Sequence, residues 1–194
     1  PDLVFVDNGA TSQKPYVLTD GLKEYYDFYN SNIGRGVYQL AEKSQNAFDT
    51  AKSKISQFIG TTDKNLIFTS GATESMNLIA YLVNQVIPSG GKILLSIYEH
   101  HSNLLIWQRL AKEKNIEIEF IKEDSILLNP LSLDGSFFNN VSLLALTHVS
   151  NVSGQTFPIA DWVQITRKHN IISVIDGAQG ITSECINLDE LNPD

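Results

Sequence analysis

From residue 64 onward, short apolar stretches alternate with segments of helical periodicity, and no other feature constrains the fold as strongly. The intervals between the apolar stretches suit βαβ units and a mostly parallel sheet. Strands are predicted at residues 66–69, 92–97, 116–121, 143–148 and 171–176, and helices at 72–86, 104–114 and from Pro158 to about residue 170. We therefore predict an α/β fold with three α/β/α layers.

The helices between the predicted strands are amphipathic. Their buried stripes are expected to be Met76, Ile79, Ala80 and Val83 in the first helix, Trp107, Leu110 and Ala111 in the second, and Ile159, Trp162, Val163 and Ile165 in the third. Residues 124–140 have the weakest pattern, and we expect them to form a surface excursion.

The first sixty residues have a different character. Residues 4–6 predict a short strand that leads into a turn, and a helix rich in tyrosine and phenylalanine follows. A polar loop at 30–36 precedes a long amphipathic helix from about residue 40 to 59, with Ala47, Ala51, Ile55 and Phe58 on its buried face. We predict two parts: residues 1–60, which pack on the main domain, and residues 61–194, which form the large domain.

Composition excludes several classes of function. The formal net charge of -8 and pI of about 4.9 argue against binding to nucleic acid or to an anionic membrane surface. A single cysteine permits no internal disulfide, and the apolar runs are too short to cross a membrane. We expect a soluble protein of a reducing compartment, the cytoplasm.

The most informative polar residue is Asp176, which follows the apolar run 171–175 and precedes Gly177, Ala178 and Gln179. Burial strongly disfavours a lone ionised carboxyl group. A protonated heterocycle or an ammonium group opposite Asp176 would offset that cost. The sequence therefore predicts a cationic ligand at this strand end.

A second cluster, residues 70–75, lies between a predicted strand and a helix. Gly71 permits a tight turn, so that the N–H groups of Ala72 and Thr73, the Thr73 hydroxyl and the helix dipole can converge on an anion such as phosphate. The alternative is an ordinary turn in which Thr73 or Ser70 caps the helix.

The third cluster, residues 99–103, contains His100 and His101. Adjacent histidines rarely chelate one metal ion, and the spacing lacks the i, i+4 pattern of a helical zinc site. His100 could stack on a flat ring or move protons, or it could belong to a solvated helix-capping segment.

The fourth cluster is residues 147–154, in which Asn151 offers donors and acceptors. Asparagine at such a position is also a common turn former. His148 has apolar neighbours, which favours a satisfied core role or a packing role. Cys185 has no basic neighbour to activate it, which favours a structural role.

All four clusters follow predicted strands, where ligands of parallel sheets gather. A phosphate cradle, an isolated histidine, an amide and a buried carboxylate together match a phosphorylated aromatic cofactor with a protonated ring nitrogen. Pyridoxal 5′-phosphate (PLP) is such a molecule.

With these motifs in their order and spacing, the chain resembles cysteine desulfurases of the selenocysteine lyase-like group. These belong to the class V aminotransferase family and to the fold type I PLP enzymes. The resemblance covers nearly the whole chain and rests on the segments 7–15, 35–37, 68–74, 99–103, 147–151 and 176–179. It implies a PLP-dependent transferase fold of the aspartate aminotransferase type, here with an incomplete large domain.

The resemblance also implies a role for each site residue. Ala72 and Thr73 would bind the cofactor phosphate, His100 would stack on the ring and help to move protons, and Ala178 would pack on the other ring face. Asp176 would pair with the pyridinium nitrogen and Gln179 with the phenolic oxygen, while Asn151 would lie near the substrate carboxylate and the cofactor. His100 is the predicted catalytic residue, and no metal is expected.

In that family L-cysteine reacts at the cofactor, an enzyme cysteine takes the substrate sulfur as a persulfide, and alanine is left. The family's cofactor-binding lysine, nucleophilic cysteine and carboxylate-binding arginine have no match here, so we expect a segment that stops just before the lysine and is inactive alone. A homodimer that passes sulfur to an acceptor protein, for iron–sulfur cluster or thio-cofactor assembly, is implied.

Three alternatives remain at this point. The first is a selenocysteine lyase or another class V lyase or aminotransferase, and the second is a non-catalytic fragment that dimerises or binds partners. The third is a metal hydrolase that uses His100, His148 and Asp176.

Overall fold

The computed structural model describes residues 2–122, 127 and 130–194. They fall into two compact units, Pro1–Leu66 and Ile67–Asp194, which are taken in turn. Part of the predicted excursion at 124–140 lies outside the described residues, namely 124–126 and 128–129.

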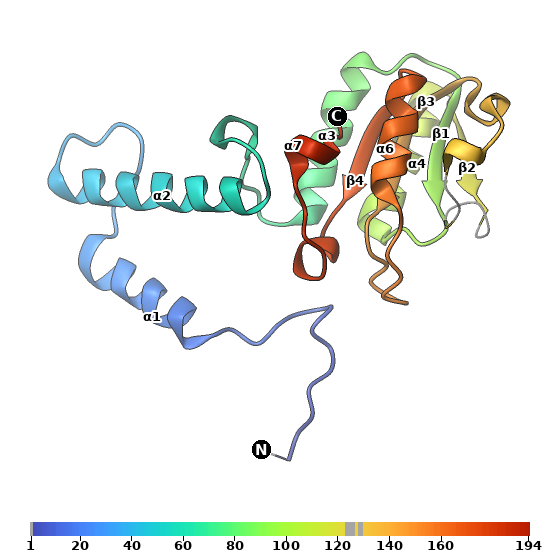
Figure 1. The fold of residues 1–194 in the computed structure, drawn as a ribbon. Helices are drawn as coiled ribbons and strands as arrows, with labels where there is room; N and C mark the ends of the chain where they lie inside the picture. The colour runs from blue at the N-terminus through green and yellow to red at the C-terminus, as the bar shows by residue number, and fades with distance from the viewer. Residues whose placement is uncertain (1, 123–126, 128–129) are drawn as a thin grey trace. The chain divides into compact units, whose positions relative to one another are not determined.

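The first unit is helical (Figure 1). It contains α1 (Tyr16–Glu24), the π-helical turn η1 (Tyr25–Tyr29), α2 (Gln39–Phe58) and the short 3-10 helix η2 (Asp63–Asn65). The strand predicted at residues 4–6 is wrong: Val4 and Val6 are 81% and 85% exposed, and a strand without a neighbour to pair with is not stable.

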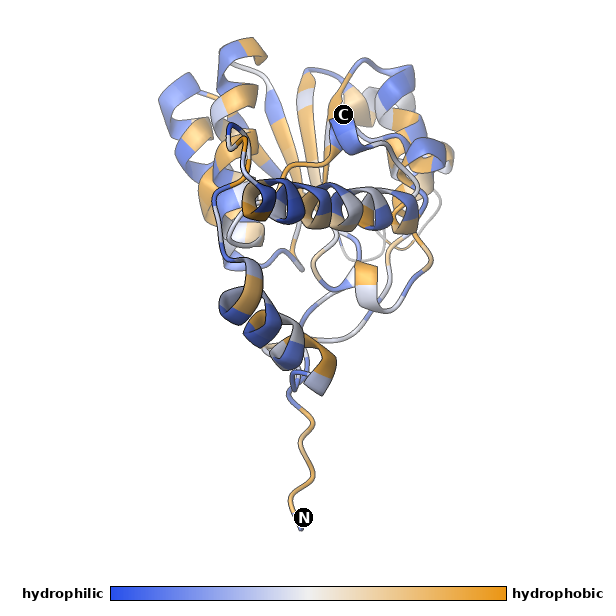
Figure 2. Cartoon of the chain, turned by 90° about the vertical axis from the view of Figure 1, so that its left-hand side faces the viewer, coloured by the Kyte–Doolittle hydropathy of each residue, from blue (hydrophilic) through white to orange (hydrophobic). Residues whose placement is uncertain are grey.

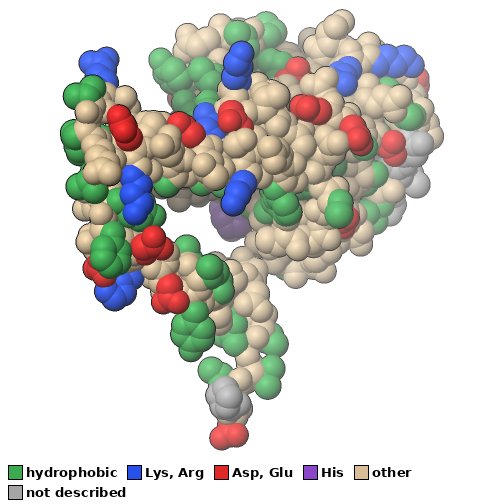
Figure 3. Space-filling model, turned by 60° about the vertical axis from the view of Figure 1, so that its left-hand side comes forward, with side chains coloured by type: hydrophobic (Ala, Val, Ile, Leu, Met, Phe, Trp, Pro, Cys, Tyr) green, Lys and Arg blue, Asp and Glu red, His purple; other side chains and the backbone are tan. Residues whose placement is uncertain are grey.

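Helix α2 matches its predicted span, but its predicted buried face is wrong. Ile55 and Phe58 are 41% and 73% exposed, and Ala47 and Ala51 are exposed as well. The buried residues of α2 are Ala41, Ser44 and Ser56, and α2 contacts η1 and η2. Hydrophobic side chains consequently lie at the surface of this unit (Figure 3).

The second unit is a four-stranded parallel sheet with helices on both faces (Figure 1). Its elements are α3 (Ala72–Val86), β1 (Lys92–Ser96), α4 (His101–Lys114), β2 (Glu117–Ile121), η3 (Pro130–Ser132), η4 (Gly135–Phe138), β3 (Val141–Thr147), α6 (Ile159–Lys168), β4 (Ile172–Asp176), η5 (Gly180–Thr182) and α7 (Leu188–Leu191). The strand order is β2-β1-β3-β4. The predicted three-layer α/β class is therefore confirmed.

Successive side chains of each strand point to opposite faces of the sheet, so the strands contribute to two cores, one on each face. Residues 93, 95, 143, 145 and 174 pack with α3 and α4, whereas residues 94, 144 and 146 pack with α6 and η4. β1 and β3 accordingly carry buried hydrophobic residues on both faces, which is typical of a covered parallel sheet, and the strands are largely orange in Figure 2.

The helix stripes predicted for α3, α4 and α6 form these cores. Trp107 and Trp162, from opposite faces, are fully buried. By contrast, the strand predicted at 66–69 is wrong, because these residues lie outside the sheet and Ile67 is 69% exposed.

Candidate active site

The candidate site lies where β1, β3 and β4 end. β1 and β3 are neighbours in space, but the chain reaches β2 between them, so the strand order reverses at this point. In open α/β sheets a crevice forms at such a switch point, outside the carboxyl ends of the strands. Glu99 and His100 follow β1, Thr147 ends β3 and Asp176 ends β4.

Asp176 is buried, as predicted, with 5% of its surface exposed. Its Oδ1 accepts a hydrogen bond from the Ala178 N–H at 3.0 Å, and its main-chain oxygen accepts one from the His148 N–H at 2.8 Å. The turn after β4 is thereby folded around the carboxylate. Among the hydrogen bonds of the described residues, Oδ2 is not engaged, which leaves it available to a donor on a ligand.

Glu99 ties three elements together at the switch point. Its Oε1 accepts hydrogen bonds from the Ser96 hydroxyl at the end of β1 and, at 3.0 Å, from the Thr147 N–H at the end of β3. Its Oε2 accepts one from Asn103 Nδ2 in α4 at 2.5 Å, and Asn103 Oδ1 in turn accepts from Trp107 Nε1 at 2.7 Å. Sequence reasoning assigned Glu99 no role, although its place beside the histidine pair was a usable signal.

Burial raises the pKa of Glu99 to about 7, and the negative charge of Asp176 contributes to the rise. The hydrogen bonds from Ser96, Thr147 and Asn103 act in the opposite direction. The residue as a whole is partly exposed, while its carboxyl group is enclosed by these donors. Two interacting carboxyl groups therefore lie at the crevice, and together they favour a cationic ligand.

His100 is the N-cap of α4. Its Nδ1 accepts a hydrogen bond from the Ser102 N–H at 3.2 Å and lies 2.8 Å from Ser102 Oγ. The His100 side chain is exposed, and its ring meets His101 edge-on with centroids 6.2 Å apart. Capping therefore fixes the ring through one nitrogen, which agrees with the helix-capping interpretation. Stacking on a flat ring or movement of protons by His100 stays a prediction.

The first turn of α3 has the form expected of an anion cradle. Gly71 precedes the helix with φ 158° and ψ 176°, a conformation essentially confined to glycine, and no side chain caps the helix. The capping alternative for Ser70 or Thr73 is therefore wrong. The N–H groups of Ala72 and Thr73 are left to an outside acceptor.

Glu74 in the same turn is occupied by Ser70. The Glu74 carboxylate accepts from the Ser70 N–H at 2.6 Å and from the Ser70 hydroxyl at 2.7 Å, and these bonds lower the pKa of Glu74. The negative charge of the Glu74 carboxylate is thereby directed toward Ser70.

The structure brings Thr73 close to the start of α4. A cavity of about 470 Å³ lies between α3 and α4 and is lined by Thr73, Asn77, His101, Ser102, Leu105, Ile106 and Arg109. The cradle and the residues that follow β1 therefore border one space.

The remaining predicted residues lie in two turns. Ala178 is exposed and Gln179 is partly buried in the turn after β4. Asn151 is exposed in the turn that follows β3, which is closed by a bridge between Val149 and Thr156.

His148 lies directly behind this site. It is 7% exposed, which confirms the predicted packing role, whereas the alternative of a satisfied core histidine is wrong because Nδ1 has no hydrogen-bond partner among the described residues. Burial lowers the pKa of His148, against a smaller effect of Glu184. The backbone of Gly180 packs against the ring, which explains why a polar partner is excluded.

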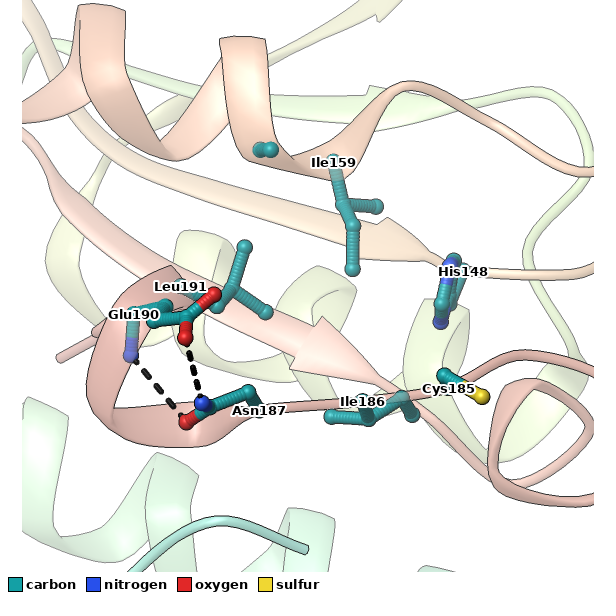
Figure 4. Close-up of a pocket in the computed structure, with 8 residues that line it drawn as sticks. His148, Ile159, Cys185, Ile186, Asn187, Glu190 and Leu191 are labelled. Atoms are coloured by element: carbon teal, nitrogen blue, oxygen red, sulfur yellow. Dashed lines mark hydrogen bonds between the residues drawn. The ribbon is translucent and has the colours of Figure 1, made fainter.

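Cys185 is exposed, so the structural role predicted for it is wrong. With His148 and Ile159 it lines a cavity of about 300 Å³ (Figure 4).

Within the described part of the chain, no group of three His, Cys, Asp or Glu residues can hold a metal ion, so the metal-hydrolase alternative gains no support. Among the described residues, no helix combines the length and apolar character needed to span a bilayer.

Residues 4–194 match the family model described as aminotransferase class-V. A probable cysteine desulfurase of Vibrio cholerae is 35% identical over 99% of this chain and 48% of its own length. Among solved structures, the apo cysteine desulfurase of Thermococcus onnurineus superimposes with a TM-score of 0.90 at 33% identity, covering 97% of this chain and 47% of that one. The cysteine desulfurase CsdA of Escherichia coli gives 0.85 at 25% identity, covering 97% and 48%.

The chain thus spans about half the length of the curated relatives it matches.

Proposed function

The chain belongs to the class V aminotransferase family, and from this premise we propose that the whole protein is a PLP-dependent cysteine desulfurase. The observation that carries the proposal is the buried Asp176 carboxylate at the end of β4, beside the end of β3, with one oxygen held by the Ala178 amide and the other not engaged in the hydrogen bonds of the described residues. The similarity to cysteine desulfurases of bacteria and archaea supports the same activity.

The residues present fit the cofactor in charge and in donor chemistry. Asp176 and Glu99 give the crevice an excess of negative charge, which suits a pyridinium ring. The uncapped first turn of α3 offers N–H donors and the positive end of the helix dipole to a phosphate. These two features carry opposite charges, as the two ends of one zwitterionic cofactor require, and they support the proposal in this way.

Each residue would then have a definite task. Asp176 would hold the proton on the ring nitrogen, Ala72 and Thr73 would bind the phosphate, and Ala178 and His100 would flank the ring. Gln179 would donate to the phenolic oxygen, and Asn151 would contact the substrate carboxylate. When bound, the cofactor supplies an electron sink for bond cleavage at the substrate Cα.

His100 is proposed as the catalytic residue that moves protons. Because Nδ1 accepts from the N-terminus of α4, a neutral His100 carries its proton on Nε2. In that tautomer Nε2–H is a hydrogen-bond donor to a reacting group. When Nδ1–H instead donates to Ser102 Oγ, 2.8 Å away, Nε2 is an unprotonated base that can take up a proton and return it.

The proposed net reaction converts L-cysteine and an enzyme thiol into L-alanine and an enzyme persulfide. The carbon–sulfur bond of the substrate breaks, a sulfur–sulfur bond forms on the enzyme thiol, and a proton takes the place of sulfur on the product. We further propose that the whole protein works in the cytoplasm as a homodimer. Its persulfide sulfur would pass to an acceptor protein for iron–sulfur cluster or thio-cofactor assembly.

The decisive assay uses the full-length protein with L-cysteine and a reductant. Equal release of alanine and sulfide supports the proposal, and turnover of selenocysteine alone would instead assign a selenocysteine lyase. Absence of both activities in cofactor-loaded protein would favour a non-catalytic role.

Asp176→Asn tests the residue that carries the proposal. It should lower turnover by at least about 100-fold, since a preorganised charge at the reacting system is lost, while much of the bound cofactor is retained. Asp189→Asn, an exposed position in α7, is the matched control and should leave turnover unchanged. Full turnover in Asp176→Asn would refute the assigned role.

A further inference from the structure

We propose that Glu99 is a positioning residue of this site, and that a proton it shares with the Ser96 hydroxyl is released when a cation binds opposite Asp176. The inference rests on the proposed function, because the cation is the pyridinium ring of the cofactor. Glu99 itself touches neither cofactor nor substrate in this proposal. It acts through α4, which carries His100, and through the ends of β1 and β3.

The hydrogen-bond chain through Glu99 has a fixed direction at both ends. At one end is the main-chain N–H of Thr147 and at the other the indole N–H of Trp107, and both can only donate. Asn103 accepts from Trp107 with its oxygen and must therefore donate to Glu99 with its nitrogen. The group between Thr147 and Asn103 must accept on both sides, which a carboxylate does and an amide does not.

Ser96 is the one partner whose direction can reverse. When Glu99 is ionised, the Ser96 hydroxyl donates to Oε1; when Oε1 carries a proton, the same hydroxyl accepts it. The bonds from Thr147 and Asn103 persist in both states, since each carboxyl oxygen keeps a lone pair for its donor. The network therefore tolerates a change of charge on Glu99 without moving α4 away from the sheet.

The ionised state of Glu99 depends on what faces Asp176. Burial is the main cause of the raised pKa of Glu99, and the negative charge of Asp176 at the end of β4 adds to it, while the hydrogen-bond partners from β1, β3 and α4 are neutral. A cation opposite Asp176 removes the contribution of that charge and also attracts the Glu99 carboxylate itself, so the pKa of Glu99 falls. The Glu99 proton then passes to solvent, and the full carboxylate holds α4 and β3 at the site.

Proton release can be counted in the full-length apo-protein. PLP is titrated by calorimetry in two buffers of different ionisation enthalpy, at pH 6 and at pH 9, for the wild type, Glu99→Gln and Glu113→Gln. With a pKa of about 7, Glu99 is roughly nine-tenths protonated at pH 6. The wild type should release about one proton more than Glu99→Gln at pH 6, and the difference should vanish at pH 9.

Glu113→Gln removes the same charge from an exposed position of α4 and should match the wild type. In Glu99→Gln, the amide N–H group of the new side chain faces either the Thr147 N–H or the Asn103 N–H, both of which are donors. Because Asn103 also accepts from Trp107, the NMR resonance of the Trp107 indole N–H should also shift. Equal proton counts for all three proteins at pH 6 would overturn the proposal. A protein that binds no PLP would instead refute the proposed function, which keeps the two failures distinct.

A second measurement tests the proposal without Glu99→Gln, in case that variant fails to fold. The infrared difference spectrum of wild-type protein at pH 6, PLP-bound minus apo, should show loss of a protonated-carboxyl C=O band. Ser96→Ala retains Glu99 and removes the acceptor of its proton, so it should shift that band. If the protonated-carboxyl band is missing, or if its frequency is unchanged in Ser96→Ala, the proton does not lie between Glu99 and Ser96 and the proposal fails.

Discussion

Gly180→Ala is expected to destabilise the protein through one contact. A Cβ built on Gly180 lies 2.3 Å from His148 Nδ1, 2.8 Å from Cγ and 3.0 Å from Cβ of the same ring. Rotation of the ring alone does not remove the clash, because the contact includes His148 Cβ and the main-chain N–H of His148 is bonded to the Asp176 oxygen. The added methyl group must therefore displace the turn after β4 or the end of β3.

The cost of such overpacking is about 1–3 kcal/mol, and the rigid surroundings favour the upper half of that range. Urea unfolding of the full-length protein, followed by tryptophan fluorescence, measures the free energy of unfolding. Gly135→Ala is the matched control, since a Cβ there meets nothing within 4 Å, and its effect should stay within about 0.5 kcal/mol.

A double-mutant cycle identifies the cause. In Gly180→Ala/His148→Ala the clashing ring is absent, so the loss should fall short of the sum of the single losses by about 1–2 kcal/mol. Additive losses, or a Gly180→Ala protein as stable as the wild type, would refute the argument from the His148 contact.

Two further outcomes are expected in the same unfolding assay. Because the pKa of Glu99 is raised from 4.5 to about 7, its contribution of at most about 3 kcal/mol is present below pH 4.5 and is lost as the pH rises to about 7. Glu99→Gln should flatten that decline, and parallel pH profiles for the two proteins would contradict it. Trp107→Phe leaves the buried Asn103 Oδ1 without its donor and should cost about 1–3 kcal/mol, whereas a loss below about 0.5 kcal/mol would show that the bond contributes little.

The fold of residues 72–176 could be predicted from the sequence because each element has both a period and a boundary signal. Pro158 immediately precedes α6, and the run before Asp176 is β4. The errors fall where apolar residues find no partner, as at residues 4–6, at 66–69 and along the exposed stripe of α2. The local sequence indicates whether a segment prefers to be buried. Whether another segment covers it depends on residues elsewhere in the chain.

The candidate site was only partly predictable. Asp176, His100 and Thr73 stand at strand ends or helix starts, so their positions follow from the fold class. The role of Glu99 does not, because it depends on a bond to Thr147, 48 residues away, and on the charge of Asp176. The missing partner of His148 Nδ1 likewise follows from the close approach of Gly180, which no local pattern indicates.

The bonds that join Glu99 to Thr147, and His148 to Asp176, have a consequence for the order of events in folding. Each closes a long stretch of chain and can form only once β1, β3 and β4 lie in register, a slow step in parallel sheets. A chain still leaving the ribosome therefore holds no competent crevice until β4 has docked. Ligand binding would then show that β1, β3 and β4 are in register. Ligand added during refolding should speed only the final phase.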